Sequence, residues 1–166
     1  MLLGDLGRED GARQAATMGS RVRARSVDMD ERRATALARS SEQWLAWLRR
    51  GLAARPDRGL AALWDLLDEW FASDDFQTSG LAAAMAGLTG NGGAATRAVV
   101  DAHRRALREL LEEPAKAAGA ADPAALAAQL HLLVEGAVVG ALIDRHAALT
   151  RHARELTEIA LARASR

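Results

Sequence analysis

The stretch HLLVEGAVVGALID, residues 131–144, is almost wholly apolar, and the fold depends on what covers it. It carries two glycines four residues apart, Gly136 and Gly140, and one acid, Glu135, near its middle. A helix that crosses a bilayer needs roughly 20 apolar residues, so this stretch is too short and its central acid is unfavourable in lipid. The remaining interpretations are a core helix buried within one chain and a helix covered by a second chain.

The composition of the whole chain favours a single helical domain. The 166 residues include no cysteine and no tyrosine, and the formal net charge is zero. The absence of cysteine excludes disulfides and thiolate chemistry, and the balanced charge does not favour nucleic-acid binding by this chain. Alanine is abundant and β-branched residues are sparse, which favours helix over sheet. The N-terminus lacks the continuous apolar segment of a secretory signal, so we expect a cytoplasmic protein without a membrane span.

Apolar residues recur at steps of three and four from Asp28 onward, which is the spacing of one helix face. Residues 1–27 instead contain four glycines, three alternating arginines and few large apolar side chains, and they are predicted to be a flexible tail. Pro114 should kink or break the helix around it, and Asp122 followed by Pro123 is a strong helix start. The pattern predicts an all-α domain over residues 28–166 with about six helices, near 28–52, 60–71, 79–88, 94–118, 123–143 and 146–164.

The two glycines of the opening stretch lie on one face of its predicted helix, with Leu133, Ala137 and Asp144 alongside. Glycine inside a helix costs about 1 kcal/mol relative to alanine, so a pair of them suggests close helix packing. The residues alone do not distinguish packing within one chain from packing across a two-fold axis.

Several segments in order resemble the regulatory domain of TetR-type transcriptional regulators. They are SEQWLAWLRRGL (41–52), LAALWDLLDEWF (60–71), AHRRALRELL (102–111) with AGAADP (118–123), and the last two helices, DPAALAAQLHLLVEGAVVGALID (122–144) and ALTRHARELTEIALARA (148–164). The resemblance implies a homodimer in which the last two helices of each chain form a four-helix interface. The residues that it places there are Leu133, Gly136, Ala137, Gly140, Asp144, Leu149, Ala153, Leu156 and Ala160.

The resemblance also implies a small-molecule effector whose binding releases the operator from a repressor. That family places a helix-turn-helix domain of roughly 45–50 residues before the regulatory domain, whereas only about 30 residues precede it here and none has that pattern. DNA binding would therefore need a module not evident in this chain. A truncated gene, a natural remnant and a free-standing dimeric ligand-binding protein all stay open.

Aromatic and methionine side chains concentrate in the first half of the predicted domain. Such side chains line adaptable apolar pockets, and they also fill cores. The candidates for binding a small, mainly apolar ligand are Trp47, Trp70, Phe71, Phe76, Met85, Leu88, His103 and Leu107. His103 lies on an apolar helix face, where it could contact a ligand or be a hydrogen-bonded core histidine.

Nothing in the sequence indicates an enzyme. No nucleophile stands beside a base at a recognisable spacing, and no glycine-rich phosphate loop follows a strand. No two histidines lie three or four residues apart on one predicted helix, so we expect no metal site, and no cofactor is implied.

Overall fold

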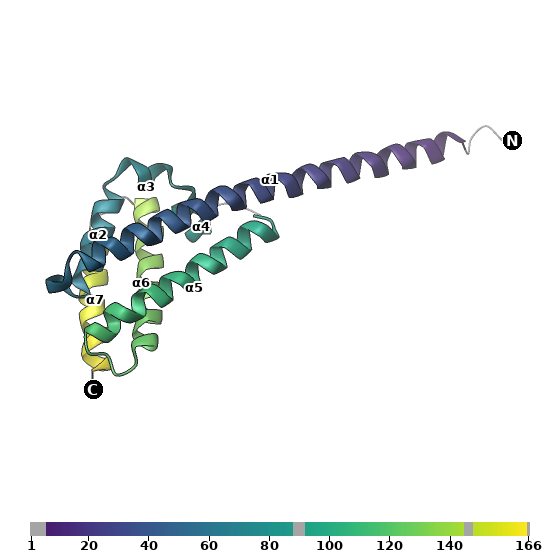
Figure 1. The fold of residues 1–166 in the computed structure, drawn as a ribbon. Helices are drawn as coiled ribbons and strands as arrows, with labels where there is room; N and C mark the ends of the chain where they lie inside the picture. Colours follow the sequence, from purple (N-terminus) through teal and green to yellow (C-terminus); the bar gives the residue numbers. More distant parts are fainter. Residues whose placement is uncertain (1–5, 88–91, 145–147, 166) are drawn as a thin grey trace.

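A computed structural model of the chain describes residues 6–87, 92–144 and 148–165. This part of the chain forms seven α-helices and contains no strand, which confirms the all-α prediction. Figure 1 shows a long first helix with a second long helix beside its C-terminal half, and the last two helices crossing behind them. Fully buried side chains from five of the helices meet between these layers: Leu48, Trp64, Leu67, Phe76, Leu107, Leu111, Leu126 and Leu130.

Helix α1 spans Leu6–Ala53 without interruption. Residues 6–27, which the sequence predicts to be a flexible tail, are therefore helical in the structure. That segment has no proline and is rich in alanine and arginine, whose helix propensity outweighs three isolated glycines. Its N-terminal half extends away from the other helices (Figure 1), and Met18, Val27 and Met29 are exposed there. A single helix before Asp28 is not the three-helix arrangement of a DNA-reading module, so the described residues upstream do not form one.

Helix α5, Ala94–Ala117, packs along α1 and is capped by it. The Asp30 carboxylate of α1 accepts hydrogen bonds from the backbone N–H of Ala95 at 3.0 Å and the hydroxyl of Thr96 at 2.6 Å. The Thr96 hydroxyl contributes most to lowering the pKa of Asp30, because these donors favour the charged carboxylate. The first N–H groups of a helix lack partners within the helix, so Asp30 fixes the position of α5 on α1.

Pro114 does not break α5, contrary to one of the two expected outcomes. The helix continues to Ala117, and Gly119, with a φ of +86°, follows its end. Proline has no N–H, so the carbonyl of Leu110, one turn earlier, loses its usual helical donor. Both residues lie at the surface of a cavity described below.

Short elements connect α1 to α5. A 3-10 turn, η1 (Pro56–Arg58), precedes α2 (Ala61–Phe71), and two short helices follow, α3 (Asp74–Thr78) and α4 (Gly80–Met85). The hydroxyl of Ser73 accepts the N–H of Phe76 at 3.4 Å, and that of Ser79 accepts the N–H of Ala82 at 3.1 Å. These two caps explain why the segment after the predicted helix over 60–71 forms two short helices.

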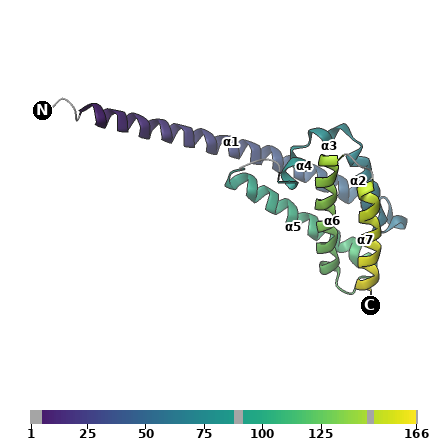
Figure 2. The same cartoon turned by 180° about the vertical axis from the view of Figure 1, so that it is seen from behind.

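Helices α6 (Pro123–Asp144) and α7 (Ala148–Ala164) lie side by side on one side of the molecule (Figure 2). Asp122 caps α6 as predicted, since its carboxylate accepts the N–H of Ala125 at 3.0 Å. Helix α7 is tied to α2 by a hydrogen bond from the indole N–H of Trp64 to the Thr157 hydroxyl at 3.0 Å. An ion pair between Arg154 and Asp65, at 2.8 Å, joins the same two helices.

Among the described helices, α6 is the one whose length and composition would allow it to cross a membrane. Only 44% of its apolar window, within residues 123–143, is buried in the structure. Core helices of soluble proteins meet the same criterion, so this property is weak evidence for a membrane span. The unburied remainder is nevertheless an apolar surface, and it defines the first candidate site.

Candidate functional site

The outer side of α6 is an apolar stripe without charge. Its residues recur at the spacing of one helix face, and those that are exposed are Ala125, Ala128, Gln129, Leu132, Gly136 and Ile143. Leu132 and Ile143 keep 67% and 66% of their surface exposed, which is unusual for such large apolar side chains. Only Gln129 among them is polar. The stripe therefore runs over most of the length of α6 with nothing in the described chain covering it.

A second apolar stripe lies next to the first, on α7. Leu156 and Ile159 are half exposed, at 50% and 51%. The two helices pack against each other, and Figure 2 shows both from their outer side. We call Gly136 and the exposed large apolar residues of the two helices, Leu132, Ile143, Leu156 and Ile159, the α6–α7 face. On α7 these residues have exposed charged neighbours, Glu155 and Arg163 among them. The four large apolar residues of this face, on two helices that pack together, distinguish it from single exposed apolar residues, which are ordinary on protein surfaces.

The structure separates the two glycines that sequence analysis grouped together. A Cβ atom built on Gly140 would lie 2.5 Å from a methyl group of Leu149, so Gly140 allows α6 and α7 of the same chain to approach closely. A Cβ on Gly136 would meet nothing within 4 Å. Close packing within one chain therefore accounts for Gly140, whereas Gly136 has open space before it.

The other residues predicted for the dimer interface also divide into two groups. Ala137 and Ala153 are buried against their own chain, and Leu133, Leu149 and Ala160 are partly buried. Leu156 is exposed on the α6–α7 face. The side chain of Asp144 lies outside the described residues. Leu132, Ile143 and Ile159 are exposed large apolar residues that sequence analysis missed, although their spacing from Gly136 and Leu156 would have placed them on the same faces.

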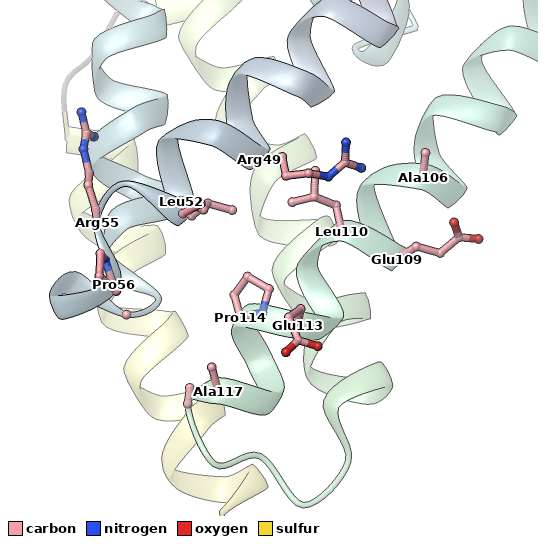
Figure 3. Close-up of a pocket in the computed structure, with 13 residues that line it drawn as sticks. Arg49, Leu52, Arg55, Pro56, Ala106, Glu109, Leu110, Glu113, Pro114 and Ala117 are labelled. Atoms are coloured by element: carbon pink, nitrogen blue, oxygen red, sulfur yellow. The ribbon is translucent and has the colours of Figure 1, made fainter.

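A cavity of about 660 Å³ lies between the C-terminal end of α1, the η1 turn and the C-terminal half of α5. In Figure 3, Leu52 of α1 and Pro114 of α5 approach it from opposite sides, and Arg49 extends beside Leu110. Its lining is Arg49, Leu52, Ala53, Arg55, Pro56, Gly59, Ala106, Glu109, Leu110, Glu113, Pro114, Ala117 and Ala118. The middle of this α1–α5 cavity is apolar and its rim is charged, which suits a mainly apolar molecule with a polar end.

A second cavity, of about 590 Å³, lies between α1, α2, α3 and α4. Trp44, Trp47 and Trp70 line it together with two carboxylate residues, Glu69 and Asp75. The ring centroids of Trp44 and Trp47 are 6.2 Å apart, and those of Trp44 and Trp70 are 5.2 Å apart. We call this the tryptophan cavity.

Two of the eight predicted ligand residues, Trp47 and Trp70, line the tryptophan cavity, and none lines the α1–α5 cavity. Phe76, Met85, His103 and Leu107 are buried in the core, Phe71 is partly buried against it, and Leu88 lies outside the described residues. Most of the candidates are therefore core residues in this structure.

The α1–α5 cavity was not predicted because its walls are mostly alanine, proline and the stems of charged residues. The proline pair Pro56 and Pro114 was its only signal in the sequence. Each proline interrupts regular backbone hydrogen bonding, and the two face one cavity.

His103 is part of a buried polar cluster between α1, α5 and α6. Its Nδ1 atom is 2.8 Å from the Ser41 hydroxyl, and burial lowers the pKa of His103 to about 4. His131, on α6, is also buried with a lowered pKa, mainly for the same reason, while nearby Glu135 opposes that shift. Glu135 accepts a hydrogen bond from Arg104 at 2.6 Å. The core interpretation of His103 thus fits its geometry better than ligand contact does.

Three ring nitrogens in or beside this cluster are buried without a hydrogen-bond partner in the described chain: Trp44 Nε1, His103 Nε2 and His131 Nε2. The described residues contain no group of three or more histidine, aspartate or glutamate side chains placed to hold a metal ion. The geometry therefore offers three candidate binding surfaces, namely one apolar face and two cavities.

Comparison with known proteins gives no relative: no family description, curated protein or solved structure matches this chain. The functional argument therefore depends on the residues and their geometry.

Proposed function

We propose that the chain is a dimeric small-molecule-binding domain, of the regulatory type found in TetR-like transcriptional regulators. The observation that supports it best is the group of exposed large apolar residues on α6 and α7, which no described residue covers. The domain binds rather than catalyses, and DNA would be reached only through a helix-turn-helix module outside the described residues.

A second copy of the same chain suits the α6–α7 face for a physical reason. In a two-fold interface the same patch meets itself, so it must be self-complementary. The exposed stripe of α6 meets this requirement, since its alanine, glycine and branched apolar side chains carry no charge that would repel its own copy. The open space before Gly136 would let the backbones of two α6 helices approach closely. Two helices from each chain would then form a four-helix interface.

The α1–α5 cavity supports the ligand-binding part of the proposal. Its volume of about 660 Å³ falls in the range of small-molecule sites, roughly 300–1,000 Å³. The Leu110 carbonyl, deprived of a helical donor by Pro114, could accept a hydrogen bond from a ligand hydroxyl or amide. The effector that we propose for this cavity is mainly apolar with one donor group. Since α5 also packs against α6, a ligand that moved α5 would alter the α6–α7 face.

The test of the dimer compares molar masses by light scattering and sedimentation at micromolar concentration. We expect the unaltered chain to be a dimer of about twice 17.7 kDa. Leu156→Glu puts a carboxylate at the α6–α7 face and should yield a folded monomer. Arg151→Gln is the matched control, because it makes the same one-unit change in charge at an exposed position on another side of α7.

A folded monomer for the unaltered chain would refute the proposed dimer. So would a dimer that Leu156→Glu leaves intact, because the interface would then lie elsewhere. Far-UV circular dichroism of each variant distinguishes a lost interface from a lost fold.

A further inference from the structure

The tryptophan cavity has a chemistry that the proposed function does not use. The ring planes of Trp44 and Trp70 are inclined by 56° to each other and those of Trp44 and Trp47 by 45°, and all three residues line the cavity. Trp44 and Trp70 are each 7% exposed, so neighbouring side chains hold these two rings in place. Three of the four tryptophans of the chain are gathered here, from two helices.

The remaining lining of the cavity is acidic and hydroxyl-rich. It consists of Ser40, Gln43, Glu69, Ser73, Asp75, Thr78, Ser79, Gly80 and Leu81 beside the three tryptophans, and it includes no lysine, arginine or histidine. Glu69 is paired with Arg55 at 2.8 Å, whereas the structure shows no ion pair for Asp75 among the described residues. The cavity therefore combines aromatic rings with a negative charge that has no cation beside it.

We propose that the tryptophan cavity binds a small organic cation, of the alkylated ammonium class. Aromatic rings attract cations through the negative potential of their faces, and tryptophan does so most strongly. An alkylated ammonium ion is poorly hydrated, so it loses little solvation on entering an aromatic cavity, and the Asp75 carboxylate supplies the counter-charge. This proposal depends neither on dimerisation nor on a ligand in the α1–α5 cavity.

A purely apolar ligand is the competing interpretation, since tryptophan also binds uncharged molecules. The negative charge of the cavity distinguishes an apolar ligand from a cationic one. An apolar molecule gains nothing from the Asp75 carboxylate, whereas a cation does; Glu69 is already paired with Arg55. The two interpretations therefore predict different changes in ligand affinity when one carboxylate is removed.

The experiment titrates the full chain with choline and, separately, with 3,3-dimethylbutan-1-ol, its uncharged isostere. Binding is followed by tryptophan fluorescence. The signal reports the cavity because the fourth tryptophan, Trp64, is fully buried elsewhere, with its N–H bonded to Thr157. We expect saturable binding of choline that is about 2- to 30-fold tighter than binding of the neutral alcohol, the range of a cation–π contribution.

Variants at adjacent aspartates give a matched pair. Asp75→Asn should weaken choline binding up to about five-fold and leave the alcohol unaffected. Asp74→Asn removes the neighbouring exposed carboxylate, which does not line the cavity, and should change neither ligand. Trp47→Leu should weaken choline binding, and circular dichroism will establish that this variant is folded.

Three results would overturn the proposal. One is the absence of saturable choline binding to the unaltered chain, and another is equal binding of choline and the alcohol. The third is choline binding that Asp75→Asn and Asp74→Asn weaken alike, since the carboxylate would then act only through the general surface charge. None of these outcomes bears on the oligomeric state, so this proposal and the proposed dimer can fail separately.

Discussion

Acidification from neutral pH should destabilise the fold through His103, and the size of the effect follows from its surroundings. The imidazole is 2% exposed, lies against Trp44 with ring centroids 5.4 Å apart, and has Ser41 as its hydrogen-bond partner. Burial lowers its pKa from 6.5 to about 4, because the charged form loses its hydration there. The value of about 4 includes smaller effects of nearby His131 and Arg104, which also lower this pKa, and of Glu135, which opposes them.

The sign of the effect is set by which state binds the proton. Above pH 6.5 His103 is neutral in both states, so its contribution to stability is fully present. As the pH falls from 6.5 towards 4, the unfolded chain takes up a proton that the folded chain does not, and stability is lost. One pKa unit is worth about 1.36 kcal/mol, so going from pH 7.5 to 4.5 should cost about 2–3 kcal/mol through His103 alone.

The assay is urea denaturation of the unaltered chain and of His103→Asn at four pH values between about 7.5 and 4.5. Asparagine does not titrate and keeps an amide near the Ser41 hydroxyl. The variant should be less stable at pH 7.5, because its side chain is smaller, and the difference in unfolding free energy should shrink by about 2–3 kcal/mol by pH 4.5. A difference that stays constant over this range would refute the assignment of the lowered pKa to His103. His131 remains in both proteins, so the part of its titration that does not depend on His103 cancels.

Two further predictions follow from the helix glycines and the α1–α5 cavity. Gly136→Ala should raise the melting temperature in monomeric protein, since its Cβ meets open space and alanine favours helix by about 1 kcal/mol. Gly140→Ala should lower the melting temperature, because its Cβ would displace Leu149. A rise in melting temperature for both variants would contradict the close contact between α6 and α7. Ala106→Trp should fill the α1–α5 cavity and abolish binding of the uncharged probe N-phenyl-1-naphthylamine. Ala102→Trp, one turn earlier at an exposed position outside the cavity lining, should leave probe binding intact. Equal binding of the probe to both variants would mean that it binds elsewhere.

Helix identity and most helix ends could be predicted because each is set by neighbouring residues. Asp122 and Pro123 start α6, Gly119 follows the end of α5, and the three- and four-residue apolar steps place the buried faces. The helix over residues 6–27, which the apolar pattern did not indicate, has a local cause as well. Few large apolar residues there indicated that nothing would be buried, which is what the exposed Met18 and Val27 show, but an exposed segment can still be helical when its residues favour helix.

The division of the apolar residues between core, cavities and outer face could not be predicted in the same way. Leu107 and Leu132 are both leucines at helical spacing, yet one is fully buried and the other 67% exposed. Periodicity states which residues share a face, and it does not state whether another helix covers that face. Whether a face is covered depends on the packing of α5, α6 and α7 against one another and against residues distant in the sequence.

The ligand preference of the tryptophan cavity could not be predicted from the sequence either. Trp47 and Trp70 could be proposed as ligand residues because tryptophan is rarely placed without a packing or binding role, yet their identity alone predicts an apolar ligand. It is Asp75, brought to them by the two capped turns of α3 and α4, that changes the preferred ligand from a neutral molecule to a cation. A turn aspartate has no signal of its own in the sequence. Its proposed role in binding follows from the three indole rings that line the same cavity.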